Sequence, residues 1–203
     1  MLEYKKKDMI NNKTDLKHYL KQDALALRII GRKRPKLFGD YIWKFEILLR
    51  KTEYYHNVSK KCKFLKIPYL FKKFRFARYS LKLGFSIPLN VFEEGLSIAH
   101  YGNIVVNAAA KVGKNCRIHE GVNIGSTNGS DKAPIIGNNV FIGTGAKIIG
   151  DISIADDTAI GANAVVVKTI SEGGSTYGGI PAKKISNNSS RSNLSPYLFD
   201  ENK

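Results

Sequence analysis

Residues 136–166 read IGNNVFIGTGAKIIGDISIADDTAIGANAVV and repeat a pattern every six residues. The aliphatic residue of each repeat falls at Ile136, Ile142, Ile148, Ile154, Ile160 and Val166. The same register continues backward through Ile124, Ile118, Val112 and Val106. A helix needs a period of 3.6 residues and an open strand a period of two, so neither explains the pattern. A six-residue period with inward aliphatic side chains predicts a β-helix, whose short strands stack into one continuous core.

The chain divides into three regions. Residues 85–185 carry the six-residue pattern, and residues 1–84 carry apolar positions at helical spacing. Within the first region, capping residues predict helices over residues 15–27, 41–55 and 68–83. Residues 186–203 are polar, and we expect them to form a mobile tail, with docking of Tyr197, Leu198 and Phe199 onto the trimer as the alternative.

The net positive charge comes entirely from the first region. Residues 1–84 carry 23 Lys and Arg against 7 Asp and Glu, whereas residues 85–203 carry ten of each. This asymmetry is consistent with an anionic partner for the helices, either a membrane surface or nucleic acid, and equally with a solvated basic surface. No nucleic-acid motif accompanies the charge, so nucleic acid is not expected.

The cysteine count and the first residues bear on location. Cys62 and Cys116 are far apart and form no CxxC motif, which fits a reducing cytoplasm. Residues 1–13 contain no apolar signal region, and no apolar run is long enough for a spanning helix. We therefore expect a cytoplasmic protein whose basic helices contact the inner membrane face peripherally.

Several segments resemble the hexapeptide-repeat acyltransferases, and among them the serine acetyltransferases and related polysaccharide O-acetyltransferases. They are GLSIAHYGNIVVN (95–107), CRIHEGVNIG (116–125), VFIGTGAKIIGDISI (140–154), AIGANAVV (159–166) and GGIPAKKI (178–185). The resemblance implies a left-handed parallel β-helix with three strands per coil, preceded by a short helical segment. It also implies an acetyl-CoA-dependent O-acetyltransferase without a metal, which assembles as a homotrimer.

Two histidines stand out in the repeats. Eighteen residues per coil would place residue 118 directly above His100, so that His119 and His100 share a corner on adjacent coils. A neutral imidazole is suited to removing a hydroxyl proton near pH 7. The resemblance assigns that role to His100, within its L-x-x-H-x-x-G stretch, and His119 is a second candidate. Cys116 falls at an inward position and is expected in the core.

The resemblance also implies where the two substrates bind. Small residues at the coil turns, Gly145, Ala146, Gly161 and Ala162, would let the pantetheine arm of CoA approach. Lys168, Pro181 and Lys183 would lie near its nucleotide end. The count pauses between Ile124 and Ile136, which predicts a projecting loop. The loop residues expected to contact the acceptor are Asn128, Asp131 and Lys132.

The chain departs from the serine acetyltransferase pattern near these residues. Ala99 replaces the acidic residue before the catalytic histidine, and the loop reads Lys132-Ala133 where that family has Arg-His. The orienting aspartate one coil earlier has no counterpart, and Glu93 and Glu94 are the nearest carboxylates that could take its place. These losses favour a neutral sugar or glycan hydroxyl, free or lipid-linked, as in capsule and exopolysaccharide synthesis. Serine O-acetyl transfer for cysteine synthesis is the alternative, while a γ-class carbonic anhydrase would need a third zinc-binding histidine in the repeats.

Overall fold

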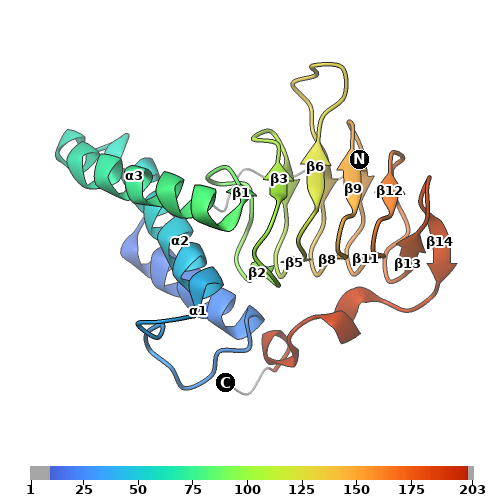
Figure 1. Ribbon diagram of the computed structural model, residues 1–203, viewed down its shortest axis with the longest axis horizontal. Helices are drawn as coiled ribbons and strands as arrows, with labels where there is room; N and C mark the ends of the chain where they lie inside the picture. Colours follow the sequence, from blue (N-terminus) through green and yellow to red (C-terminus); the bar gives the residue numbers. More distant parts are fainter. Residues whose placement is uncertain (1–9, 201–203) are drawn as a thin grey trace.

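The computed structural model describes residues 10–200 and joins a helical segment to a parallel β-helix (Figure 1). The helices are α1 (Lys13–Ala26), α2 (Tyr41–Ser59) and α3 (Lys66–Leu83), with 3-10 turns η1 (Lys63–Leu65), η2 (Ser190–Asn193) and η3 (Pro196–Leu198). The side chain of Asn12 caps α1 by accepting the N–H of Asp15 at 2.9 Å. Gly84 ends α3 at a φ of +78°, a left-handed conformation that suits glycine. The three predicted helices are therefore confirmed.

The strands form three sheets, one along each face of the β-helix. The first sheet contains β1 (Phe85–Ser86), β3 (Ile104–Val106), β6 (Asn123–Gly125), β9 (Lys147–Ile149) and β12 (Val165–Val166). The second contains β4 (Lys111–Val112), β7 (Ile135–Ile136) and β10 (Ser153–Ile154). The third contains β2 (Ser97–Ile98), β5 (Arg117–Ile118), β8 (Phe141–Ile142), β11 (Ala159–Ile160), β13 (Thr176–Gly178) and β14 (Lys183–Ser186). All pairs are parallel except β13 with β14, so successive coils stack in register.

The predicted inward aliphatic side chains form the core. Ile118, Ile142 and Ile160 lie above one another on the third sheet, and each is fully buried. Cys116 is 1% exposed, and burial raises the pKa of its thiol well above the ordinary value, so it is a core residue. The six-residue period therefore arises because each face contributes one inward side chain to a continuous aliphatic stack.

A buried arginine joins the helices to the first coil of the β-helix. Arg50 of α2 donates to the carboxylate of Asp23 in α1, with Nε 2.7 Å from Oδ2. It also donates to the carbonyl oxygens of Phe92 at 2.8 Å and Glu93 at 2.7 Å. Asp23 in turn accepts the N–H of Gly95 at 2.9 Å. Because the Arg50 and Asp23 charges are paired with each other and with backbone groups of the first coil, they hold α1, α2 and that coil in one arrangement.

Two further carboxylates of α2 accept backbone N–H groups at the start of the β-helix. Glu46 Oε1 accepts from Ile98 at 3.0 Å, and Glu53 Oε1 accepts from Asn90 at 2.7 Å. Strand β2, which contains Ile98, is the end strand of the third sheet. An end strand presents unpaired backbone groups, so the carboxyl group of Glu46 covers part of an edge that could otherwise pair with another chain.

The C-terminal segment differs from the mobile tail that we expected. It turns back along the β-helix and ends beside α1 (Figure 1). Ser195 donates its hydroxyl to the carbonyl of Leu25 at 2.6 Å, and Arg28 donates to the carbonyl of Leu194 at 3.3 Å. Leu194 is buried beneath this contact. Hydrogen bonds and one buried leucine thus join to α1 a segment whose polar composition suggested mobility.

Within residues 10–200, none of the helices combines the length and apolar character that crossing a bilayer requires.

Candidate active site

His100 and His119 lie at the corner where the third sheet turns into the first. His100 follows β2 and His119 follows β5, on adjacent coils, because the N–H of Ala99 donates to the carbonyl of Ile118 at 2.9 Å. Their ring centroids are 5.8 Å apart in an edge-to-face arrangement. The ring of His119 also contacts that of Phe141 at 5.2 Å. The structure therefore brings the two predicted histidines together.

The register at His100 differs from the sequence prediction. Ile98 pairs with Ile118, twenty residues along the chain, whereas Ile142 pairs with Ile160, eighteen residues along. Counting by sixes fails here because β3 buries both Ile104 and Val106, and the turn before it is longer. His100 therefore lies two residues beyond the inward position that Ile98 occupies. Its side chain is exposed, which leaves the imidazole accessible to a substrate.

Glu120 is a site residue that the sequence prediction missed. Nitrogen atoms of His100 and His119 and a carboxylate oxygen of Glu120 all lie within 4.8 Å of one another. Glu120 Oε2 is 3.9 Å from His119 Nδ1. The pKa of Glu120 is lowered, first by a hydrogen bond from its own backbone N–H and then by a hydrogen bond with the Thr144 side chain and by the two nearby histidines. Glu120 therefore carries a negative charge near neutral pH. The twenty-residue coil, which the repeat count did not reveal, places Glu120 beside His100.

Two polar side-chain atoms at this corner lack a hydrogen-bond partner within the described residues. His119 Nε2 and Glu120 Oε2 are both buried from solvent, and neither has a hydrogen-bond partner among residues 10–200. Burial, followed by the nearby Arg117 charge, lowers the pKa of His119, which keeps the imidazole neutral at pH 7. Buried polar groups without partners are rare in folded proteins and often mark a binding or catalytic site.

The three groups also form the one cluster within the described residues that could hold a cation. Tetrahedral zinc ligands at about 2.0–2.2 Å from the ion lie about 3.5 Å from one another, whereas Glu120 Oε2 is 3.9 Å from His119 Nδ1. Two imidazoles and one carboxylate at this spacing are better suited to proton transfer, in which the groups need only face a common substrate.

The small residues predicted to contact CoA continue the same corner along the β-helix. The N–H of Gly145 donates to the carbonyl of Glu120 at 2.8 Å, and the N–H of Asn163 donates to that of Thr144 at 2.8 Å. Gly145, Gly161 and Ala162 therefore form a strip that starts beside the histidines. Gly145 has a φ of +72°, and a Cβ there would lie 2.1 Å from Asn163 Oδ1, so only glycine fits. Ala146 is fully buried, and its side chain belongs to the core.

The strip ends at the residues predicted for the nucleotide end of CoA. The N–H of Val165 donates to the carbonyl of Gly179 at 3.0 Å, which places the segment leading to Pro181 and Lys183 one coil beyond Ala162. Pro181, Lys183 and Lys168 are all exposed. Two lysines are thus available for phosphate groups at the end of the β-helix away from the helical segment (Figure 1).

The predicted acceptor loop lies at a different corner of the same chain. Residues 126–134 connect β6 of the first sheet to β7 of the second and project from the β-helix (Figure 1). Asn128, Asp131 and Lys132 are exposed, and Lys132 Nζ is 2.8 Å from Asp151 Oδ2. One full strand of the first sheet separates this loop from the histidine corner, so a single chain does not bring the two predicted parts together.

Comparisons with known proteins agree with the repeat pattern. Residues 133–168 match the family described as "Bacterial transferase hexapeptide (six repeats)". Serine acetyltransferase from Helicobacter pylori (strain J99) is 40% identical over 93 residues, which cover 45% of this chain and 54% of that protein. Serine acetyltransferase from Mycobacterium tuberculosis is 43% identical over 75 residues, covering 36% and 33%. The chain thus spans about a third to a half of the curated relatives it matches.

Solved structures extend the likeness into the helical segment. Serine acetyltransferase from Brucella abortus strain S19 superimposes with a TM-score of 0.69 at 26% identity, covering 88% of this chain and 72% of that one. The same enzyme in complex with coenzyme A gives a TM-score of 0.68 at 27% identity. The predicted left-handed β-helix with a helical N-terminal segment is confirmed.

The predicted acceptor is wrong. The departures at Ala99 and Lys132 favoured a sugar or glycan, but the curated relatives that match this chain at 36–43% identity are serine acetyltransferases. These relatives do not support polysaccharide synthesis or a lipid-linked glycan. The altered residues are therefore changes within a serine acetyltransferase-like framework.

Proposed function

We propose that this hexapeptide-repeat protein, a relative of the serine acetyltransferases, transfers the acetyl group of acetyl-CoA to the hydroxyl of L-serine. The observation that carries the proposal is the corner at which His100, His119 and Glu120 meet the strip of small residues. An acetyl group at the end of a pantetheine arm lying along that strip would reach the histidines. The serine acetyltransferase relatives supply the acceptor.

His100 would act as the general base. Its neutral imidazole removes the serine hydroxyl proton as the oxygen attacks the thioester carbonyl carbon. The tetrahedral intermediate collapses, the carbon–sulfur bond breaks, and the imidazolium returns its proton to the departing CoA thiolate. The products are O-acetylserine and CoA, and no covalent enzyme intermediate is needed.

Glu120 and His119 would support this step. A carboxylate near an imidazole orients the ring and stabilises the positive charge that forms when the ring takes up a proton. Glu120 is negatively charged and faces both histidines, so we assign it as the positioning carboxylate for His100. The unpartnered Nε2 of His119 is free to bond the substrate or the oxyanion in the intermediate.

The remaining site residues are proposed from their positions. The backbone at Gly145, Gly161 and Ala162 would contact pantetheine, and a related enzyme has been solved with coenzyme A. Lys168 and Lys183, beside Pro181, would meet the phosphates. Lys132, with Asp131 and Asn128, would bind the serine carboxylate and ammonium, charges that demand polar partners.

A homotrimer would complete the site. Since the loop and the histidines lie at different corners of one chain, the loop of a neighbouring subunit can reach the histidine corner only in a symmetric ring. In such a ring each site is built from two chains. We propose a cytoplasmic location, in keeping with the two free cysteines.

Peripheral contact of residues 1–84 with an anionic membrane is also proposed. The outward face of α3 exposes five large apolar side chains: Ile67, Leu70, Phe71, Phe74 and Leu81. Lys66, Lys73 and Lys82 flank them. Apolar side chains between lysines suit a helix lying in the headgroup region. Flotation of the intact protein with phosphatidylglycerol liposomes tests this, and a protein that stays in the bottom fraction would contradict it.

The acetyl-transfer proposal is tested by measuring thiol release from acetyl-CoA with L-serine and with a panel of neutral sugars. We expect turnover with serine, and a fall in kcat/KM of about 10²–10⁴ in His100→Ala, the range of general base catalysis. His18→Ala is the matched control, because His18 is an exposed histidine of α1 outside the cluster of His100, His119 and Glu120. Turnover on a sugar but not on serine would overturn the acceptor, and undiminished activity in His100→Ala would overturn the base.

A further inference from the structure

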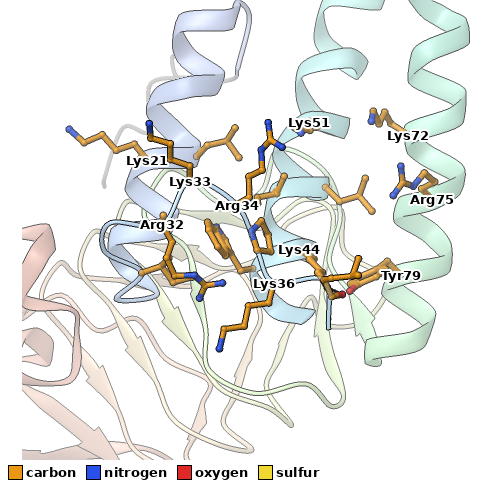
Figure 2. A pocket seen from close by; sticks show the side chains of 18 of the residues that line it. Lys21, Arg32, Lys33, Arg34, Lys36, Lys44, Lys51, Lys72, Arg75 and Tyr79 are labelled. Atoms are coloured by element: carbon orange, nitrogen blue, oxygen red, sulfur yellow. Dashed lines mark hydrogen bonds between the residues drawn. The ribbon is translucent and has the colours of Figure 1, made fainter. Parts of the chain in front are cut away.

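The helical segment contains a cavity that the acetyl-transfer site does not use. It lies between α1, α2 and α3 beneath the loop that joins α1 to α2, and Figure 2 shows it from close by. Its volume is about 1010 Å³, comparable to the pockets that hold small molecules. All of its lining residues precede the β-helix in sequence. The cavity is therefore separate from the histidine corner.

The lining is strongly basic. Ten of the twenty lining residues are Lys or Arg, and none of these described residues is acidic. In Figure 2, Arg34 and Lys51 lie on one side of the opening, and Lys72 and Arg75 of α3 lie on the other. Burial lowers the pKa of Lys72, and the charges of Lys51 and Arg75 lower it further, so these cations are close enough to repel one another. An anion between them would relieve the repulsion.

The floor of the cavity is aliphatic. Leu20 and Leu25 come from α1, Ile29 follows that helix, and Ile47 and Leu48 come from α2. Trp43, also in the lining, is 5% exposed and lies beneath Arg32, whose guanidinium carbon is 5.1 Å from the ring centroid. An apolar floor beside a basic opening is complementary to a molecule with an apolar part and an anionic part.

We propose that this cavity binds a phosphate-bearing amphiphile, with its hydrocarbon on the floor and its phosphate among Arg34, Lys51, Lys72 and Arg75. Guanidinium groups bind phosphate oxygens through paired hydrogen bonds, and ammonium groups add charge. Arg32 is less available, since it already pairs with Asp40. The proposal does not depend on acetyl transfer, because the two sites share no residue.

The fluorescence of Trp43 provides a direct measurement, because it is the single tryptophan among 203 residues. The full chain is titrated with octyl phosphate, with inorganic pyrophosphate, with octyl glucoside and with phosphatidylglycerol vesicles, and calorimetry is run in parallel. We expect saturable binding of octyl phosphate that weakens as salt is raised. A response to vesicles that octyl phosphate competes away identifies a membrane lipid as the source, whereas a response to octyl phosphate alone identifies a soluble one.

Two double variants make the result specific. Lys51→Gln with Arg75→Gln removes two charges at the opening, and affinity for octyl phosphate should fall by about tenfold or more. Lys60→Gln with Lys61→Gln removes two exposed charges outside the lining and should leave affinity unchanged. If both double variants weakened the affinity for octyl phosphate equally, the net charge of the protein alone would explain the loss, and the proposed site would be overturned. Binding of pyrophosphate or octyl glucoside as tight as octyl phosphate, or no heat and no fluorescence change, would also overturn it.

Discussion

At the scale of single residues, the corner combines two imidazoles with a carboxylate that only the folded coil reveals. Glu120 directly follows His119 in sequence, but its closeness to His100 depends on a coil of twenty residues. A regular count of eighteen residues predicted the histidine pair and could not predict the carboxylate. The residues that bear the chemistry were therefore predictable from motif and period, while their charge environment was not.

The positioning role of Glu120 predicts a specific kinetic result. Glu120→Gln keeps the size of the side chain but removes the negative charge facing the imidazoles. We expect kcat to fall by about tenfold or more while KM for acetyl-CoA stays nearly constant, because the charge acts only when His100 takes up a proton. Glu120→Asp should recover part of the loss. Steady-state kinetics that instead show a raised KM with kcat unchanged would assign Glu120 to substrate binding.

At the scale of secondary structure, the repeats were more predictable than the segments at either end. The register of each strand can be read from its inward aliphatic residue, because each face of a coil buries one such side chain. That rule breaks at the first coil, where Ile104 and Val106 are both buried and the turn is longer. It also has nothing to say about residues 190–198, whose order depends on contacts with α1. Tertiary contacts between distant segments leave no period in the sequence.

The contact between α2 and strand β2 predicts a dependence of stability on pH. Burial and the nearby Asp23 carboxylate raise the pKa of Glu46 well above its ordinary value. In the folded protein Glu46 therefore keeps a proton that it releases above about pH 4.5 in the unfolded chain. The folded state then binds more protons than the unfolded state, and the free energy of unfolding falls as pH rises, by about 1.4 kcal/mol per pH unit for one proton. The fall ends once pH passes the folded pKa.

Glu46→Gln should remove this slope. The amide keeps an oxygen that can accept the N–H of Ile98, as Glu46 Oε1 does at 3.0 Å, but it has no proton to lose. We expect the variant to match wild type near pH 4.5 and to exceed it in free energy of unfolding at pH 7 and above. Urea unfolding at several pH values measures the difference. Parallel curves for the two proteins would show that Glu46 is ionised in the fold.

At the scale of the whole molecule, two surfaces with different chemistry occupy opposite ends. The helical segment carries the positive charge and the basic cavity, while the strip of small residues leads from the histidines toward Lys183 at the other end (Figure 1). The first coil of the β-helix connects the two surfaces, and Arg50 holds it to the helices by donating to both Asp23 and the carbonyl of Phe92. A ligand in the cavity would touch α2, the helix whose Glu46 side chain accepts the N–H of Ile98 in strand β2, and His100 lies two residues beyond that strand.

The separation of the loop from the histidine corner predicts complementation between inactive chains. His100→Ala removes the general base from the histidine corner of its chain, and Lys132→Ala removes a serine-binding residue from the loop of its chain. Neither variant alone should therefore be active. Trimers that contain both variants, selected through two purification tags, should recover about a third of the wild-type rate, because one site in three then unites an intact corner with an intact loop. Trimers that mix His100→Ala with His119→Ala are the matched control, since every corner is then defective. No recovery in the first mixture would place the loop and the histidines in the same chain's site, and recovery in the control would show that His100 and His119 do not act at one corner.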